Sequence, residues 1–165
     1  MGFPTIPGVP LPDGVLTPLY EYDFGTRFKY NDLSGVMTIQ PPPVRQILPT
    51  VAPKVDADGN EMAGIASVLH QVPLGTYTGW NTVASGFYKG HIRTNTGAYI
   101  PFAKTKTARL ASGDPRPSLE ERYGTHETYV AQVRAAAERL VRGRYLLKDD
   151  ADRLIAQAEA SKVLK

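Results

Sequence analysis

Apolar side chains recur at steps of three and four residues in the last third of the chain. This spacing is typical of a helix that buries one face. Two such helices are predicted, the first ending at Gly143 and the second beginning with Asp149 as its N-cap. Their buried positions are Tyr129, Val133, Ala136, Ala137, Leu140 and Val141 in the first, and Ala151, Leu154, Ile155 and Ala158 in the second. The sequence therefore predicts a helical hairpin within residues 114–165.

A short helix is predicted just before this hairpin. Ser118-Leu-Glu-Glu121 has the pattern of a capping box, in which the Ser118 hydroxyl accepts from the amide of Glu121 and the Glu121 carboxylate accepts from the amide of Ser118. Pro117 precedes the box, and Gly124 is the type of residue that ends a helix. Thr125 is then placed to cap the first helix of the hairpin.

The middle region, residues 54–113, has the pattern of short strands. Val51–Val55 and Met62–Val68 flank Asp56–Glu61, whose Asp-Gly pair favours a hairpin turn because both residues tolerate positive φ. A calcium loop would place its glycine sixth, whereas Gly59 is fourth, so the hairpin is the preferred interpretation. The other predicted strands of this region are Val68–Leu74 and Ala98–Ala103.

Proline dominates residues 1–53, where it occupies positions 4, 7, 10, 12, 18, 41, 42, 43, 49 and 53. Because proline fixes φ and lacks an amide donor, this region cannot form long helices or central strands. Phe3–Pro12 is predicted to be an extended arm that lies on another surface, and Val36–Gln40 is predicted to be a short strand. The expected fold class is α+β. It combines a proline-rich arm over 1–53, a small irregular β-sheet over 54–113 and the C-terminal helical hairpin over 114–165, all in one structural unit.

The composition narrows the classes of function. The chain of 165 residues carries a net charge of +3, and the lack of cysteine excludes disulfides and Cys-ligated metals. No apolar run is long enough to span a membrane, and the N-terminus lacks the pattern of a signal peptide. We therefore expect no membrane partner, and the sequence assigns no compartment.

No serine has the surroundings of a hydrolase nucleophile. The sharp strand-to-helix turn of α/β hydrolases requires glycine two residues before and two after the serine, and no serine here has glycine two before it. The histidines, His70, His91 and His126, lie too far apart for a typical metal motif. We predict no catalytic residue, metal or cofactor in this chain. His70 would act as a base only with an external serine, and the simpler interpretation is a half-buried strand histidine with one hydrogen bond.

The most distinctive segment is Val72–Asn81, which contains the only tryptophan of the chain. Gly79 is expected to let the backbone turn or approach another group closely. The aromatic and hydrogen-bonding side chains around it suggest one wall of a site, or one side of a packing interface. The candidate substrate-cleft or packing residues are Tyr77, Trp80 and Asn81, together with the nearby His70.

A second interpretation rests on charge, because residues 62–113 contain no Asp or Glu. The basic residues of this window are Lys89, Arg93, Lys104, Lys106 and Arg109, and its aromatic residues are Tyr77, Trp80, Phe87, Tyr88, Tyr99 and Phe102. Such a mixture can bind an anionic small molecule or single-stranded nucleic acid. The small net charge and the lack of an RNA motif make nucleic acid the less favoured ligand. A third interpretation is a structural or assembly segment whose arm clasps a neighbouring copy, which would make the protein a homo-oligomer.

Four strings of the sequence resemble a known family when they are taken in order. They are Val51–Ile65, Val72–Asn81, Tyr99–Thr105 and Ser112–Gly124. Together they resemble the C-terminal region of a family of mostly uncharacterised bacterial proteins described as alpha/beta hydrolase domain-containing. The resemblance implies a longer complete protein, with the hydrolase part and its nucleophile upstream of this region. It implies that this chain is an accessory portion, inactive alone, of a protein that cleaves an ester or amide through an acyl-enzyme. The implied partner is the upstream hydrolase domain, in the same or a separate chain.

Overall fold

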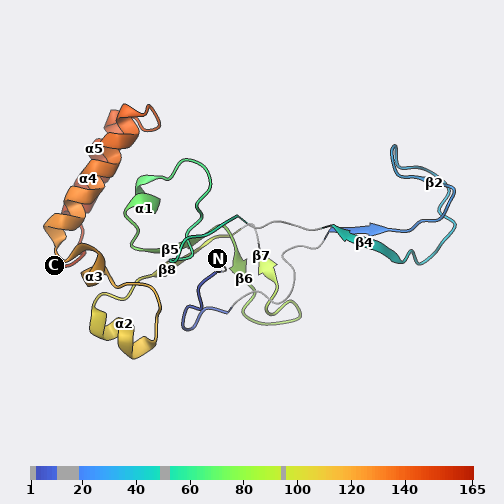
Figure 1. Cartoon of the computed structure of the whole chain (residues 1–165), viewed down its shortest axis with the longest axis horizontal. Coiled ribbons are helices and arrows are strands. Elements are labelled where there is room, and N and C mark those ends of the chain that lie inside the picture. The colour runs from blue at the N-terminus through green and yellow to red at the C-terminus, as the bar shows by residue number, and fades with distance from the viewer. Residues whose placement is uncertain (1–2, 11–18, 49–52, 94–95) are drawn as a thin grey trace. The chain divides into compact units, whose positions relative to one another are not determined.

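The computed structural model describes residues 3–10, 19–48, 53–93 and 96–165 (Figure 1). Contacts divide the chain into two compact units: unit 1 comprises Met1–Leu11 with Pro53–Lys165, and unit 2 comprises Pro12–Ala52. Across the described residues the fold is mixed, with five helices and four two-stranded sheets. This is consistent with the predicted α+β class.

Unit 2 is built from two antiparallel strand pairs. β1 (Leu19–Tyr22) pairs with β4 (Val44–Leu48), and β2 (Phe28–Lys29) pairs with β3 (Ser34–Gly35). The strand predicted over Val36–Gln40 is wrong. That segment makes isolated backbone bonds to the turn before β2 instead of joining a ladder, and the neighbouring strand begins only after the proline triplet.

The sheet part of unit 1 holds two further pairs. β5 (Gly75–Thr78) pairs with β8 (Ala98–Pro101), and β6 (Asn81–Thr82) pairs with β7 (Ile92–Arg93). The predicted strand Ala98–Ala103 is thus confirmed as β8. Gly75 permits the close approach in the first pair, because a Cβ there would lie 2.4 Å from the carbonyl oxygen of Ile100.

The turn predicted at Asp56–Glu61 is present, but Met62–Ser67 does not form the strand that was predicted to follow it. Val55 and Glu61 form an antiparallel bridge, and Gly59 adopts a φ of 84°. The Asp56 carboxylate accepts from the amides of Asp58 and Asn60, both at 2.9 Å, which closes an Asx-type turn. The flanking strand predicted over Val51–Val55 lies partly outside the described residues.

Two helices lie where strands or loops were predicted. α1 (Val68–Gln71) replaces the predicted strand Val68–Leu74, because Ser67 adopts the extended N-cap conformation and Pro73 follows the single turn. α2 (Lys106–Ser112) was not predicted. Its N-cap, Thr105, accepts from the amide of Ala108, and its C-cap, Gly113, is left-handed with a φ of 72°.

The C-terminal helices confirm the helical pattern. α3 (Leu119–Tyr123) begins with the predicted capping box, and α4 (His126–Arg142) begins at the predicted cap, Thr125. α5 (Lys148–Ala160) starts slightly earlier than predicted, with Leu147 as N-cap. Asp149 lies in the first turn instead, where its carboxylate is favoured by the helix dipole.

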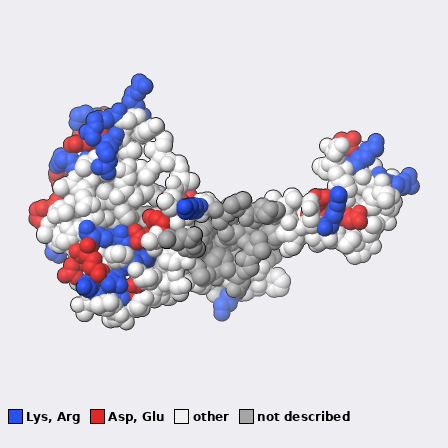
Figure 2. Space-filling view, in the orientation of Figure 1, with Lys and Arg blue, Asp and Glu red and all other residues white. Residues whose placement is uncertain are grey.

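α4 and α5 form the predicted antiparallel hairpin (Figure 1). The ring nitrogens of His126, the first residue of α4, face the carbonyl oxygens of Glu159 in the last turn of α5 and of Val163 just after it. The predicted stripe residues enter the core of unit 1, together with Val68, Val72 and Phe102 from the segment around the β5–β8 pair. On the outer surface of the helices, basic and acidic side chains are interspersed (Figure 2). No helix within the described ranges is long and apolar enough to cross a membrane.

The N-terminal segment, residues 3–10, packs against the rest of unit 1. Ile6 is buried, and the amide of Val9 donates to the carbonyl oxygen of Ile6 at 3.1 Å. The extended conformation predicted from Phe3 is therefore interrupted by a turn at Pro7–Gly8. The last two residues of that predicted arm lie outside the described residues.

Candidate functional site

Tyr77 is the centre of an aromatic face on the β5–β8 pair. Strand alternation buries Thr76 and Thr78 on one side of β5 and leaves Tyr77 half-buried on the other. Its cross-strand partner is Tyr99, and the two rings stack with centroids 5.3 Å apart. The ring of His70 lies 5.7 Å from that of Tyr77. His70, Tyr77 and Tyr99 are called the aromatic face below.

α1 positions His70 on this face. Its Nδ1 lies 3.0 Å from Oγ of Ser67, and Nε2 has no hydrogen-bond partner among the described residues. Ser67 itself is the N-cap of a single helical turn, with Ile65 and Leu69 where a nucleophile elbow requires glycine. The contact therefore restrains the imidazole ring, and Ser67 lacks the flanking glycines of an α/β-hydrolase nucleophile turn.

The two tyrosines are held by the loop that enters β5. The Tyr99 hydroxyl donates to the carbonyl oxygen of Leu74 at 3.2 Å, and the Leu74 amide donates to the Tyr77 hydroxyl at 3.4 Å. Burial raises the pKa of Tyr77, and burial together with the neighbouring Tyr77 raises the pKa of Tyr99. Both hydroxyls are therefore neutral at physiological pH, and the face presents apolar rings with a few fixed polar groups.

A buried polar network supports β5 from behind. Asn60 donates from Nδ2 to the carbonyl oxygen of Gly75 at 3.2 Å and accepts the Tyr77 amide at 2.8 Å. Thr76 donates its hydroxyl to the carbonyl oxygen of Asp58 and accepts from Nη1 of Arg116 at 2.8 Å. The backbone beneath Tyr77 is thus tied to two distant segments of the chain, one at Asp58 and Asn60 and one at Arg116.

Arg116 is the hub of this network and is only 2% exposed. It is held by Asp114 and also donates to the carbonyl oxygens of Ile100 and Pro101, at 3.0 and 3.2 Å. Its guanidinium carbon lies 5.1 Å from the centre of the Phe102 ring. No buried side-chain nitrogen or oxygen of the described residues lacks a partner. The network is therefore a fully satisfied support, which holds the aromatic face rigidly.

Trp80 and Asn81 lie apart from the aromatic face. The Trp80 ring packs edge-on against Phe3 with centroids 5.3 Å apart. This contact holds the N-terminal segment against the rest of unit 1. Asn81 is exposed in β6 opposite Arg93, and its side chain accepts the amide of Thr82. No ring contact joins Trp80 to the aromatic face among the residues with described positions. The structure thus brings together two of the four sequence candidates, His70 and Tyr77.

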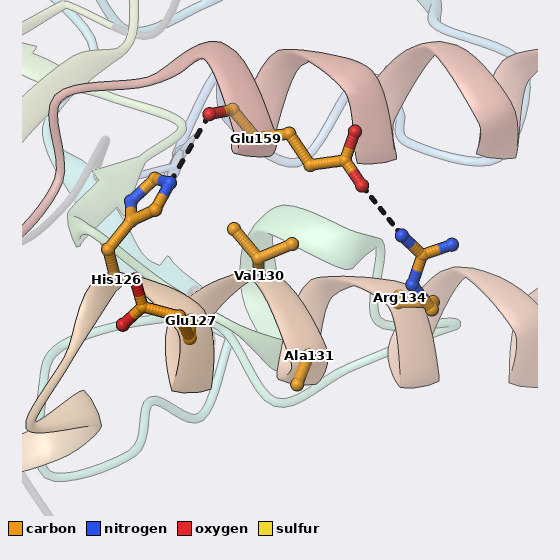
Figure 3. Close-up of a pocket in the computed structure, with 6 residues that line it drawn as sticks. All are labelled: His126, Glu127, Val130, Ala131, Arg134 and Glu159. Carbon is orange, nitrogen blue, oxygen red and sulfur yellow. Dashed lines mark hydrogen bonds and ion pairs between the residues drawn. The ribbon is translucent and has the colours of Figure 1, made fainter.

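A groove between α4 and α5 is lined by His126, Glu127, Val130, Ala131, Arg134 and Glu159 (Figure 3), with a volume of about 390 Å³. Both ring nitrogens of His126 face backbone carbonyl oxygens, at 2.8 and 3.2 Å. Arg134 pairs with the Glu159 carboxylate at 2.6 Å. The groove's cationic and imidazole groups are thus used to join the two helices.

The basic residues of the window 62–113 differ in their surroundings. Arg109 donates to both carboxylate oxygens of Glu121, at 2.8 and 3.0 Å, so its charge is neutralised. Lys104 and Lys106 are exposed at the start of α2. Within the described part of the chain, no group of three or more His, Asp or Glu residues is placed to hold a metal ion.

From the sequence, Tyr99 was assigned only to the window 62–113 and not paired with Tyr77, and Arg116 was not identified as a functional residue. Tyr99 reaches Tyr77 only through the β5–β8 register, which pairs residues 22 positions apart. Arg116 lies between Pro115 and Pro117, a pattern typical of a surface turn, but its side chain is buried. The one available signal was its position two residues after Asp114, which favours a local ion pair.

A comparison with protein-family models matches residues 27–156 to the family described as alpha/beta hydrolase domain. The matched range includes the whole aromatic face and the network that supports it. No curated protein and no solved structure matches this chain.

Proposed function

This chain belongs to the alpha/beta hydrolase domain family, and on that basis we propose that it is the C-terminal accessory portion of an ester or amide hydrolase. In this proposal the catalytic nucleophile is supplied by residues outside this chain, either upstream in the same polypeptide or in a separate one. The upstream hydrolase part is thus the partner of this chain. The chain alone is expected to be inactive.

The observation that carries this proposal is the aromatic face. Ligand sites are usually concave pockets lined by apolar side chains and a few fixed polar groups. Their lining residues must be held rigidly by the surrounding structure. Tyr77 and Tyr99 supply stacked apolar surface, and His70 supplies an imidazole fixed through Nδ1. The satisfied network behind β5 prevents this wall from shifting when a substrate binds.

We assign the residues roles on this basis. The rings of Tyr77 and Tyr99 contact the apolar part of the substrate, and Nε2 of His70 faces the cleft as a hydrogen-bonding group. Trp80 supports the site from outside by clamping Phe3, and Asn81 belongs to the packing interface with the catalytic part. The reaction of the complete protein proceeds through an acyl-enzyme formed on the external nucleophile, so no residue of this chain is assigned a catalytic role.

Hydrolysis of p-nitrophenyl esters tests this proposal. The 165-residue chain should show no turnover above buffer. Addition of the upstream hydrolase part, in the same polypeptide or as a separate chain, should give turnover that requires the serine of its Gly-x-Ser-x-Gly turn. Turnover by the chain alone would refute the proposal, as would undiminished turnover by the upstream part after this chain is removed.

A further inference from the structure

The hairpin between β6 and β7 carries an unusually exposed aromatic tip. Phe87 is 93% exposed and the adjacent Tyr88 is 59% exposed. Gly86 and Gly90 flank the tip, with φ values of 85° and 83° that side chains rarely adopt. Contiguous exposed apolar surface rimmed by polar residues is typical of an interaction site.

Hydrogen bonds hold the tip in this conformation. The Lys89 amide donates to the carbonyl oxygen of Gly86 at 3.1 Å, and the His91 amide donates to that of Tyr88 at 3.0 Å. The rings of Phe87 and Tyr88 pack edge to face, with centroids 5.0 Å apart and planes at 88°. The turn therefore has a defined backbone, from which Phe87 extends outward.

The charged residues of the hairpin itself have one sign. Lys89 lies next to the aromatic pair and Arg93 ends the hairpin, and both are exposed. No Asp or Glu occurs anywhere in residues 62–113. Charge complementarity therefore favours an anionic partner whose surface also accepts aromatic rings.

We propose that this hairpin is a peripheral membrane anchor that inserts Phe87 and Tyr88 into the interface of a bilayer rich in anionic lipids. Lys89 and Arg93 then lie at the level of the anionic headgroups. The sequence has no apolar run long enough to span a membrane, but a contact with the membrane interface does not require a spanning helix. The inference goes beyond the proposed hydrolase role and does not depend on it.

The geometry favours a lipid surface over single-stranded nucleic acid. Base stacking needs open ring faces along a groove that follows the backbone, whereas here the edge-to-face pair covers one ring with the other. A convex apolar tip with cations behind it suits a soft interface. Because only two basic residues face the headgroups and salt screens exposed charges, binding should be weak, reversible and sensitive to salt.

Vesicle sedimentation with the whole chain tests the anchor. Sucrose-loaded phosphatidylcholine vesicles are compared with vesicles containing about 30% phosphatidylserine, because only the latter carry the negative surface. The wild type should sediment with the anionic vesicles and dissociate at high salt. Phe87→Ala with Tyr88→Ala, and separately Lys89→Ala with Arg93→Ala, should each lower the partition coefficient about tenfold or more.

A matched control distinguishes the tip from general surface apolarity. Tyr145 and Leu147, in the link between α4 and α5, are 64% and 72% exposed. Tyr145→Ala with Leu147→Ala should leave the partition coefficient unchanged. The fluorescence of Trp80 and the helical circular dichroism verify that each variant is folded. The proposal is overturned if wild type sediments equally with both vesicles, if the tip variants bind like wild type, or if labelled oligo-dT binds the tip while anionic vesicles do not.

Discussion

The carboxylate of Asp114 accepts two hydrogen bonds from the guanidinium of Arg116, from Nε to Oδ1 at 3.0 Å and from Nη2 to Oδ2 at 2.6 Å. Burial by itself raises the pKa of the Asp114 carboxyl. Hydrogen bonds from the side chain and amide of Arg116, with the charges of Arg116 and Arg109, outweigh burial and hold that pKa below its usual value. The pair therefore remains ionised, and it orients the rest of the guanidinium toward β5 and β8.

Arg116→Lys should be strongly destabilising. A lysine cannot reproduce the planar fork, so Asp114, Thr76 and the β8 carbonyl oxygens would lose buried partners. Because lysine keeps the charge but leaves several buried acceptors unpaired, we expect a loss of about 2 to 4 kcal/mol in the free energy of unfolding. Urea denaturation followed by circular dichroism measures it.

Arg134→Lys is the matched control, because Arg134 pairs with Glu159 at an exposed position. Its cost should remain within about 1 kcal/mol. Equal losses for the two variants would show that the Arg116 network does not support the fold.

Gly75 and Gly79, both in the distinctive segment Val72–Asn81, should respond differently to alanine. At Gly75 a Cβ would lie 2.4 Å from the Ile100 oxygen, and this backbone contact cannot yield without opening the β5–β8 pair. We expect Gly75→Ala to cost about 2 to 3 kcal/mol. At Gly79 the nearest atom is the Glu61 carboxylate at 3.6 Å, so Gly79→Ala should lie within about 0.5 kcal/mol of wild type. Comparable thermal midpoints for the two variants would contradict this assignment.

These two glycines also show what the sequence could predict. It identified the segment as distinctive but attributed the close backbone approach to Gly79, whereas Gly75 is the one that requires it. The choice depends on which strand pairs with β5. That partner, β8, is separated from β5 by the β6–β7 hairpin, and no local signal sets the register between them.

The helix caps and the buried face of α4 were predicted correctly because they depend on short-range sequence patterns. The capping box from Ser118 to Glu121 and the stripe of α4 depend on residues within a few positions of one another. α2 also has local signals, an N-cap at Thr105 and a C-cap at Gly113. They were not recognised because residues 54–113 were assigned to short strands. The aromatic face joins α1, β5 and β8, so only its His70 and Tyr77 could be found without the fold.

Glu121 should make the stability depend on pH in the acid range. Hydrogen bonds from Arg109, and then from Ser118, lower the pKa of Glu121 to about 2 from its ordinary value of 4.5. A lowered folded-state pKa stabilises the protein above the unfolded value, and this contribution is lost as the pH falls from about 4.5 to about 2. Glu121→Gln should therefore have a lower thermal midpoint than wild type at pH 6, with the difference shrinking toward pH 2. A difference that stays constant over this range would contradict the mechanism.

Phe3 and Trp80 should be energetically coupled. Their edge-to-face contact is the only ring contact that ties the N-terminal segment to unit 1 among the described residues. In a double-mutant cycle with alanine, the two changes should fall short of additivity by about 0.5 to 1.5 kcal/mol. Chemical denaturation monitored by circular dichroism measures all four proteins, because Trp80 cannot report on its own replacement. Strict additivity would mean that the two rings act independently.

Tyr77 offers the sharpest test of the aromatic face as a substrate wall. In the proposed complete hydrolase, Tyr77→Phe keeps the stacked ring and loses only the weak hydroxyl contact to the Leu74 amide, so ester turnover should stay near wild type. Tyr77→Ala removes the ring, and kcat/KM should fall about tenfold or more, because one buried aromatic contact contributes more than 1.4 kcal/mol. Tyr145→Ala removes an equally large ring from an exposed site outside the face and should leave kcat/KM unchanged. If Tyr77→Ala lowered the thermal midpoint but not kcat/KM, the face would be a packing surface and not a wall of the substrate cleft.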